Sequence, residues 1–110
     1  MLMTIISTVV VTANQGADPV ELLQHLGKGL ARIKSYNGVQ EATLSAVTVG
    51  GAGTNSMVVM VTCEDWTTYG KIQQELNTDS EMIQLMLEGG KLSTWQTFTS
   101  QTIDFDLLPS

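Results

Sequence analysis

The single histidine, His25, is the side chain in this sequence best suited to move a proton near neutral pH. Histidine is the one residue type that ordinarily changes its charge between about pH 5 and 8. His25 lies at the border of an apolar helical stripe, beside Gly29 and Arg32. That position is typical of a general base or ligand contact at the mouth of a cleft, and also of an ordinary residue at a helix border. We predict His25 as the catalytic residue and Arg32 as a ligand contact.

Two aromatic residues, Trp66 and Tyr69, stand three positions apart in the helical segment 64–76. This spacing puts both on one helix face together with Leu76, and that face has to meet a sheet. Anchoring the helix on the core is the simpler interpretation. The Tyr69 hydroxyl needs a polar partner if it is buried, so it could also bind a ligand carbonyl. We predict that Trp66, Tyr69 and Trp95, which opens the last strand, bind a ligand.

Other reactive groups give weaker signals. Cys63 is the only cysteine, so no intrachain disulfide can form, and the carboxylates of Glu64 and Asp65 are expected to raise its pKa. We therefore predict a structural role for this thiol. The glycine-rich segment GGAGTN, residues 50–55, lacks the lysine and the strand-to-helix setting of a P-loop, and it predicts a hairpin turn. No histidine and carboxylate spacing indicates a metal, and no metal site is predicted.

Composition restricts the partners. The chain has 110 residues, which predicts one domain over 1–110, and it carries only five Lys and Arg residues with a net charge of −6. Nucleic acid and anionic membrane surfaces are not expected partners, because both are bound by clustered cations. The apolar run of MLMTIISTVVVTANQ is short, hydroxyl-rich and without positive charge, so it predicts a strand rather than a signal peptide or a membrane span. A cytoplasmic location is predicted.

Hydrophobic periodicity predicts strands and helices in alternation. The predicted elements are a strand at 4–13, a helix at 19–36, strands within 39–51 and 56–64, a helix from 66 to 88 interrupted at 77–80, and a strand from 93. The apolar stripe of the first helix comprises Leu22, Leu23, Leu26, Leu30 and Ile33.

Capping residues set the predicted helix ends. Asp18 and Pro19 suit the start of the first helix, and an Asn-Gly pair at 37–38 suits its end. Asp79 or Ser80 can begin the second piece of the interrupted helix, and the glycines at 89–90 are expected to end it.

This element order is the ferredoxin-like βαββαβ pattern, an α+β fold with a four-stranded antiparallel sheet and two helices on one face. The helices cover one side of such a sheet. The strands carry apolar or hydroxyl side chains on both sides, and only 15% of the chain is charged, against an average of about 25%. Stacking the second side against a copy of itself would bury it, so we predict a homodimer through the sheet face.

The segment VGGAGTNSMVVMVTCEDWTTYGKIQQELNTDSEM resembles the dimeric α/β barrel superfamily. It is most similar to small uncharacterised members near the antibiotic-biosynthesis monooxygenase and NIPSNAP-like branches. The shared features are a glycine-rich hairpin with Gly50 and Gly51, a strand, and an acidic-aromatic helix start with tyrosine at the next turn. A further shared feature is Asp79 two residues before Glu81. These motifs cover residues 49–82, and the element order covers the rest of the chain.

The resemblance implies a dimeric barrel and a range of activities. Members similar to this chain include cofactor-free oxygenases, polyketide cyclases, haem-degrading enzymes, isomerases and proteins without a known activity. The haem-degrading members place a helix histidine, or an Asn, Trp and His set, around iron. This sequence offers only His25 and no full set. We therefore predict no cofactor.

Two functional hypotheses follow. The first is a cofactor-independent monooxygenase, cyclase or isomerase acting on a small apolar or aromatic molecule, in which His25 moves a proton while Trp66 and Tyr69 shape the cleft. The alternative is a non-catalytic module that binds a small molecule or another protein. A cavity of a few hundred Å³ that contains His25 would favour the enzyme. A cleft packed shut by the aromatic residues would favour the module.

Overall fold

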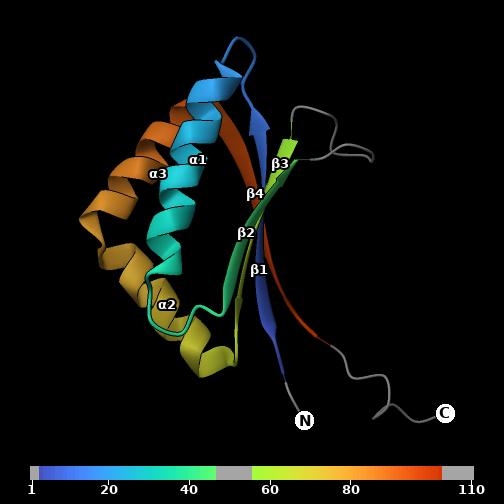
Figure 1. The fold of residues 1–110 in the computed structure, drawn as a ribbon, viewed down its shortest axis with the longest axis vertical. Coiled ribbons are helices and arrows are strands. Elements are labelled where there is room, and N and C mark those ends of the chain that lie inside the picture. Colours follow the sequence, from blue (N-terminus) through green and yellow to red (C-terminus); the bar gives the residue numbers. More distant parts are fainter. Residues whose placement is uncertain (1–2, 47–55, 103–110) are drawn as a thin grey trace, which may run out of the picture.

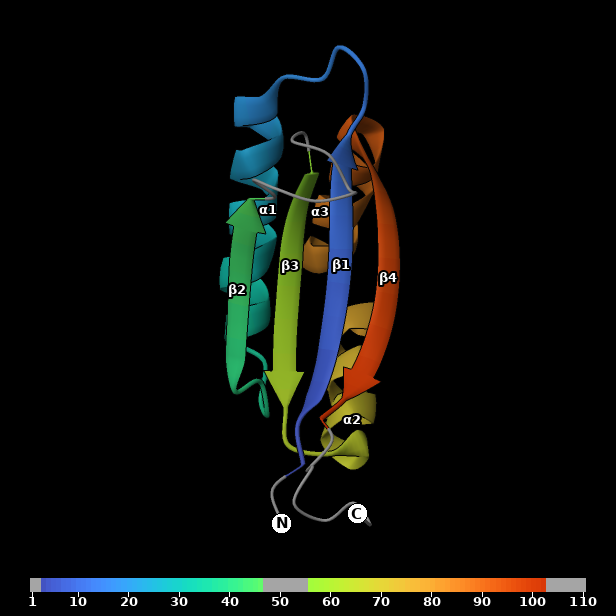
Figure 2. The ribbon, with the colours of Figure 1, turned by 90° about the vertical axis from the view of Figure 1, so that its right-hand side faces the viewer.

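Four antiparallel strands lie against three helices in the computed structural model, which describes residues 3–46 and 56–102. The elements are β1 (Ile5–Ala13), α1 (Pro19–Lys34), β2 (Glu41–Ala46), β3 (Ser56–Cys63), α2 (Trp66–Thr78), α3 (Ser80–Leu92) and β4 (Ser93–Gln101). The strand order is β2-β3-β1-β4. All three helices cover the same side of the sheet (Figure 1), and Figure 2 looks onto the other side, which no described element covers. The predicted ferredoxin-like α+β fold is confirmed.

Successive side chains along each strand point to opposite faces of the sheet. In the central strand β1, Val9 lies opposite Val59 of β3 and Thr97 of β4, and all three face the helices. The residues between them, such as Val10, face the open side. Val, Ile and Thr dominate β1, and Val is the commonest residue of β3, because β-branched side chains suit a pleated surface.

The first helix begins as the sequence predicts and ends slightly earlier. The Asp18 carboxylate accepts a hydrogen bond from the Val20 amide at 2.9 Å, and proline occupies the first turn. The helix ends at Lys34, two residues before the predicted end, and the chain then turns through Gly38, whose φ is +94°. Leu23 was placed on the buried stripe but is 50% exposed, because it lies at the flank of the sheet-facing side.

The second helical region divides at Asp79, as the sequence predicts. The Asp79 carboxylate accepts hydrogen bonds from the amides of Glu81 (3.2 Å) and Met82 (3.4 Å) and so begins α3. The prediction that the two glycines at 89–90 end this helix is wrong, because α3 continues to Leu92. Each glycine costs a helix interior about 1 kcal/mol relative to alanine, which is too little to end the helix here. The predicted glycine-rich turn and the residues after 102 lie outside the described part of the chain.

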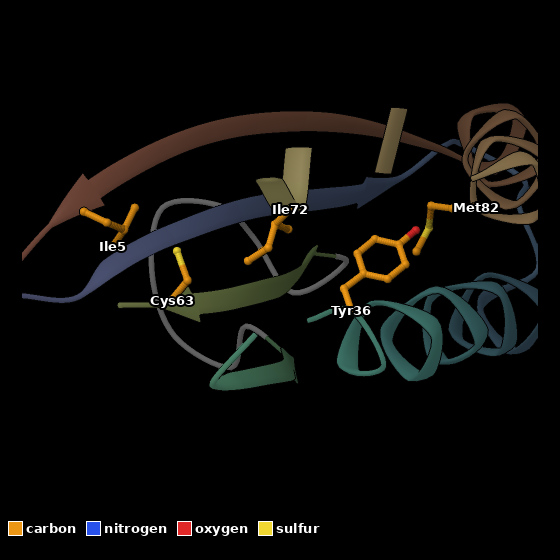
Figure 3. Close-up of a cluster of buried hydrophobic side chains, with 5 residues drawn as sticks. All are labelled: Ile5, Tyr36, Cys63, Ile72 and Met82. Carbon is orange, nitrogen blue, oxygen red and sulfur yellow. The ribbon is translucent and has the colours of Figure 1, made fainter. Parts of the chain in front are cut away.

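The buried core gathers between α1, α2 and the sheet. Ile5 and Cys63 come from neighbouring strands, while Tyr36, Ile72 and Met82 come from the helical layer and the turn after α1 (Figure 3). All five are at most 5% exposed. No described helix is long and apolar enough to cross a membrane.

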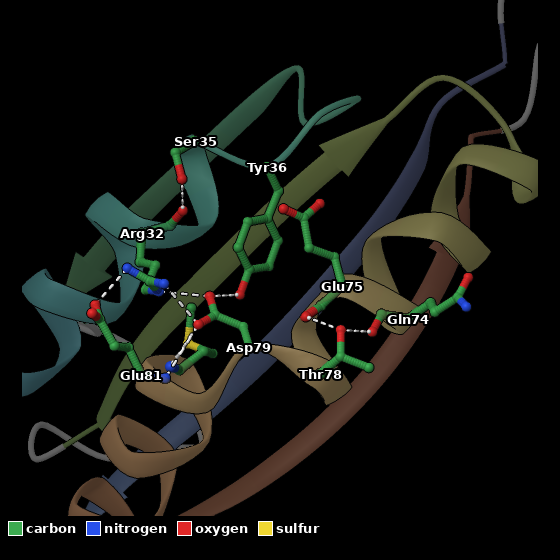
Figure 4. Close-up of polar contacts among 9 residues, drawn as sticks. Arg32, Ser35, Tyr36, Gln74, Glu75, Thr78, Asp79 and Glu81 are labelled. Atoms are coloured by element: carbon green, nitrogen blue, oxygen red, sulfur yellow. Dashed lines mark hydrogen bonds and ion pairs between the residues drawn. The ribbon is translucent and has the colours of Figure 1, made fainter.

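A polar junction holds α1 against the α2–α3 break (Figure 4). Two guanidinium nitrogens of Arg32 donate to the two carboxylate oxygens of Asp79 at 2.6 and 2.7 Å, and a third donates to Glu81 at 2.6 Å. The Tyr36 hydroxyl also donates to Asp79, at 2.6 Å. Such a two-point contact between guanidinium and carboxylate is strongly directional. The junction therefore fixes the position of α1 over the sheet.

The junction shifts the ionisation of its members. The hydrogen bond from Arg32, and then that from Tyr36, holds the pKa of the Asp79 carboxyl far below its usual range. Burial, and then the bond to Asp79, raises the pKa of the Tyr36 phenol well above its usual value. A carboxyl whose pKa is depressed on folding stabilises the fold above its unfolded pKa of about 4 and loses that effect as the pH falls.

We expect Asp79→Asn to lower the midpoint of thermal unfolding by several degrees at pH 7, because the paired charge is removed. The difference from wild type should shrink as the pH falls below about 4, since Asp79 of the unfolded wild-type chain then binds a proton that the folded state still excludes. Thermal unfolding followed by circular dichroism over this pH range measures both effects. Glu21→Gln, at an exposed position, is the control. A difference that stays constant with pH would contradict the assigned role of Asp79.

Candidate functional site

A cleft between the helices and the sheet contains two adjoining hollows. The His25 hollow lies under α1 and α3 and has a volume of about 110 Å³. The Tyr69 hollow lies under α2 and has a volume of about 280 Å³. Apolar side chains of β1, β3, α1 and α3 form most of the walls, so any molecule bound there would be largely shielded from water.

His25 lines the first hollow, and one of its ring nitrogens is buried without a hydrogen-bond partner among the described residues. Its side chain is 17% exposed, and Nδ1 has no hydrogen-bond partner among the described residues. Oε2 of Glu88 lies 3.5 Å from Nδ1, beyond good hydrogen-bond distance but close enough for a small rotation to form the bond. Buried polar atoms without partners are rare, and this one can serve a bound molecule or accept Glu88 as its partner.

Glu88 is a candidate site residue that the sequence did not reveal. It is 63 positions from His25, and only the packing of α3 beside α1 brings the two together. Its carboxylate is 40% exposed and also accepts a hydrogen bond from Nε2 of Gln84 at 3.1 Å. That contact, one helical turn away on α3, orients the carboxylate. No local spacing could have identified this pair.

Trp95 lines both hollows, and the ligand contact predicted for it stays a prediction. Its indole Nε1 donates to Oγ of Ser93 at 2.6 Å, and that hydroxyl donates to the carbonyl of Gly89 at 2.7 Å. A Cβ atom on Gly89 would lie 3.1 Å from Cζ2 of the indole. The indole thus rests on a glycine and is held by a hydrogen bond.

Tyr69 lines the larger hollow, and Trp66 supports it from outside. Their rings meet edge to face, with centroids 5.4 Å apart and planes at 83°. Trp66 is 47% exposed, and its Nε1 donates to Oε1 of Gln101 at 2.9 Å. The Tyr69 hydroxyl is 3.3 Å from Oγ1 of Thr99, a long contact that a ligand oxygen could replace. The direct ligand contact predicted for Trp66 stays a prediction.

Arg32 lies at the polar junction and outside the linings of both hollows. Its guanidinium is occupied by Asp79 and Glu81. It lines a separate open groove on the outer side of α1 and α3. The prediction that Arg32 binds a ligand therefore stays untested, beside a structural role that the contacts do show.

Cys63 is 3% exposed, and its thiol donates to the carbonyl of Asp65 at 3.6 Å. Its pKa is raised, as the sequence predicts, but burial is the main cause and the charge of Asp65 contributes less. A raised thiol pKa disfavours a nucleophilic role. In the described part of the chain, no group of three or more His, Cys, Asp or Glu side chains is placed to hold a metal ion.

The fold and the cleft together define a ferredoxin-like α+β protein with a mostly apolar site beneath its helices. Comparison with protein-family models and with curated protein sequences finds no match. Solved structures do match over nearly the whole chain, with identities low enough that the likeness shows the fold alone.

Three of these structures illustrate the range of proteins that share the fold. SnoaB, a cofactor-independent oxygenase from Streptomyces nogalater, has 15% identity over 97% of this chain and 98% of its own, with a TM-score of 0.68. An uncharacterised NIPSNAP domain protein from Burkholderia xenovorans has 14% identity over 96% and 99%, with a TM-score of 0.69. A dimeric ferredoxin-like protein of unknown function from Thermobifida fusca has 12% identity over 93% and 92%, with a TM-score of 0.65. The predicted resemblance in fold is confirmed.

We expect Gly89→Ala to displace the indole of Trp95, because the new methyl group would crowd the ring. Gly90→Ala is the matched control, since nothing lies within 4 Å of a Cβ there. Both changes should be made in a Trp66→Phe background, which leaves Trp95 as the remaining tryptophan. Gly90→Ala should stabilise the protein by up to about 1 kcal/mol, and Gly89→Ala should gain less or lose stability.

Tryptophan emission and thermal unfolding measure the two effects. Only Gly89→Ala should change the emission maximum. Identical spectra and equal stabilities for the two variants would show that the indole does not rest on Gly89.

Proposed function

We propose that this protein is a cofactor-independent enzyme that removes a proton from a small, mostly apolar organic molecule. Oxygenases, cyclases and isomerases that work without a cofactor can share this first step, because each needs an electron-rich carbanion or enolate of its substrate. The observation that carries the proposal is the hollow beside His25, whose buried Nδ1 has no partner among the described residues. The cofactor-independent oxygenase SnoaB, which has the same fold, is consistent with it.

The mechanism pairs His25 with Glu88. A small rotation of the Glu88 carboxylate would let it accept a hydrogen bond from Nδ1–H of His25. Nε2 would then carry the lone pair and act as the base, while the carboxylate stabilises the imidazolium that forms. An orienting group behind the base is the usual arrangement of such pairs.

The surroundings strengthen the attraction between the two charges that this transfer creates. The hollow is walled by Leu26, Leu85 and Met86, among other apolar side chains. Charges interact more strongly in such a medium than in water, so a new imidazolium and a new carbanion stabilise each other. The same walls limit the substrate to small and apolar molecules.

A non-catalytic module that binds a small molecule is the second candidate. The small volume of the His25 hollow favours it, because 110 Å³ is less than the cavity of about 150 Å³ that takes up benzene in an engineered protein. In this case the cleft holds a ligand and His25 only hydrogen-bonds it. The two candidates differ in whether proton transfer occurs.

We further propose that two copies of the chain associate through the open face of the sheet. The exposed side of the strands carries Ile6, Val10, Val58, Met60 and Phe98, as given by the strand register. Glu41 is the one charged residue that the described strands place there. A face with this composition favours burial against a partner. The protein from Thermobifida fusca, which has the same fold and is dimeric, supports association of two copies. The cytoplasm stays the proposed location.

We expect wild-type protein to speed the exchange of C–H protons next to the carbonyl of 2-pentanone, a slender ketone, in D2O. His25→Asn should lower the exchange rate by roughly 100-fold or more, because it removes the base while keeping a similar shape. Glu88→Gln should lower it less, since the base remains but loses its orienting charge. Proton NMR measures the rates, and Glu75→Gln is the control at an exposed position.

Equal rates for wild type and His25→Asn would exclude His25 as the base. Binding of the ketone without any exchange would support the second candidate instead.

We expect wild-type protein to sediment with twice the chain mass of 11.9 kDa. Phe98→Lys, at a 53% exposed position on the open face, should shift the mass towards that of one chain, because it places a charge in the proposed interface. Leu87→Lys, at a 61% exposed position on α3, is the matched control and should stay dimeric. A monomeric wild type, or equal dissociation of both variants, would rule out the sheet-face dimer.

A further inference from the structure

The two hollows of the cleft share one wall. Five residues line both of them: Val9, Ile33, Val59, Met86 and Trp95. Each hollow alone falls below the lower end of the range for ligand pockets, about 300 Å³, whereas a joined cleft exceeds it. We propose that they form one bipartite binding site for an elongated, uncharged molecule. The end that carries the acidic C–H group lies at His25, and a hydroxyl or carbonyl oxygen at the other end lies at Tyr69. This inference rests on the proposed function and specifies the substrate class.

The linings show why the ligand is uncharged. Among the residues that the structure describes, no Lys, Arg, Asp or Glu lines either hollow. A buried charge without a partner is strongly unfavourable, so an anionic or cationic group could not enter the joined cleft at low cost. The negative carboxylates of α3 lie on the outer side of the helices, where they also disfavour an anion.

The distribution of polar groups gives the ligand its orientation. The Tyr69 hollow includes Ser7, Gln73 and Thr97 beside Tyr69, whereas the His25 hollow is apolar except for His25 itself. Hydroxyl and amide groups can both donate and accept hydrogen bonds, so they suit a ligand hydroxyl or carbonyl. The long contact of the Tyr69 hydroxyl with Thr99, 3.3 Å, leaves that group free to bind such an oxygen instead.

The shared wall has one fixed and one adaptable side. Trp95 is fixed by its hydrogen bond to Ser93 and by the packing of its indole ring against Gly89. Met86 is an unbranched side chain with three rotatable bonds, so it can move aside at little cost. Its displacement would connect the hollows, while Trp95 continues to limit the width of the passage. Trp95 is therefore the residue that selects slender molecules.

A series of straight-chain alcohols from 1-butanol to 1-dodecanol tests this assignment. The alcohol oxygen should lie at Tyr69 and the tail should grow into the His25 hollow. Isothermal titration calorimetry should then show affinity rising up to about fourfold per methylene until the joined cleft is full. Octanoate should bind at least tenfold more weakly than 1-octanol, because its charge cannot be buried.

Two glycines of α1 provide a matched pair of variants. Gly29 lines the His25 hollow, whereas nothing lies within 4 Å of a Cβ at Gly27. Gly29→Leu should fill the hollow and stop the rise in affinity at a shorter alcohol, and Gly27→Leu should leave the series unchanged. Tyr69→Phe should weaken all alcohols by a similar factor of about three to ten, the value of one hydrogen bond.

Two outcomes would overturn the bipartite site. One is the same length limit in wild type and Gly29→Leu, and the other is equal affinity for octanoate and 1-octanol. These measurements report binding without proton transfer, so they can fail while the exchange assay with 2-pentanone succeeds, and the reverse. Failure of the proposed function is thereby distinguished from failure of this inference.

Discussion

The Asp79 carboxylate is the contact on which the helical layer depends. One side chain begins α3, receives two bonds from Arg32 on α1, and accepts the hydroxyl of Tyr36. With Asp79 only 10% exposed, water cannot easily replace these partners. Because it anchors α1 and α3 to the same point, the carboxylate sets the separation of the helices over the sheet. The size of the cleft beneath the helices therefore depends on this contact.

Local signals in the sequence were sufficient for much of the fold. Strand alternation, the cap formed by Asp18, and the break at Asp79 all act over a few residues, so each could be predicted without knowing the rest of the chain. The prediction that the glycines at 89–90 end this helix is wrong, because α3 continues through both of them to Leu92. A local rule about glycine in helices also does not include the contact of Gly89 with the indole of Trp95.

The candidate site was less predictable, because its parts come from distant segments. His25 was identified by residue type, but its neighbour Glu88 becomes visible only when α3 packs beside α1. Arg32 follows His25 by seven positions on the same helix and was predicted to bind a ligand. In the structure its guanidinium instead binds Asp79. In both cases the direction of a side chain around its helix decides the partner, and periodicity gives that direction only approximately.

The passage from α3 to β4 contains no loop residue, since the helix ends at Leu92 and the strand begins at Ser93. Ser93 thus serves both the end of the helix and the first position of the strand. An insertion of one residue here would turn every following side chain of β4 to the opposite side of the sheet. Trp95 would leave the cleft and Gln96 would enter it. Insertions and deletions should therefore be rare at this joint in functional descendants of the chain, and length changes are better accommodated elsewhere.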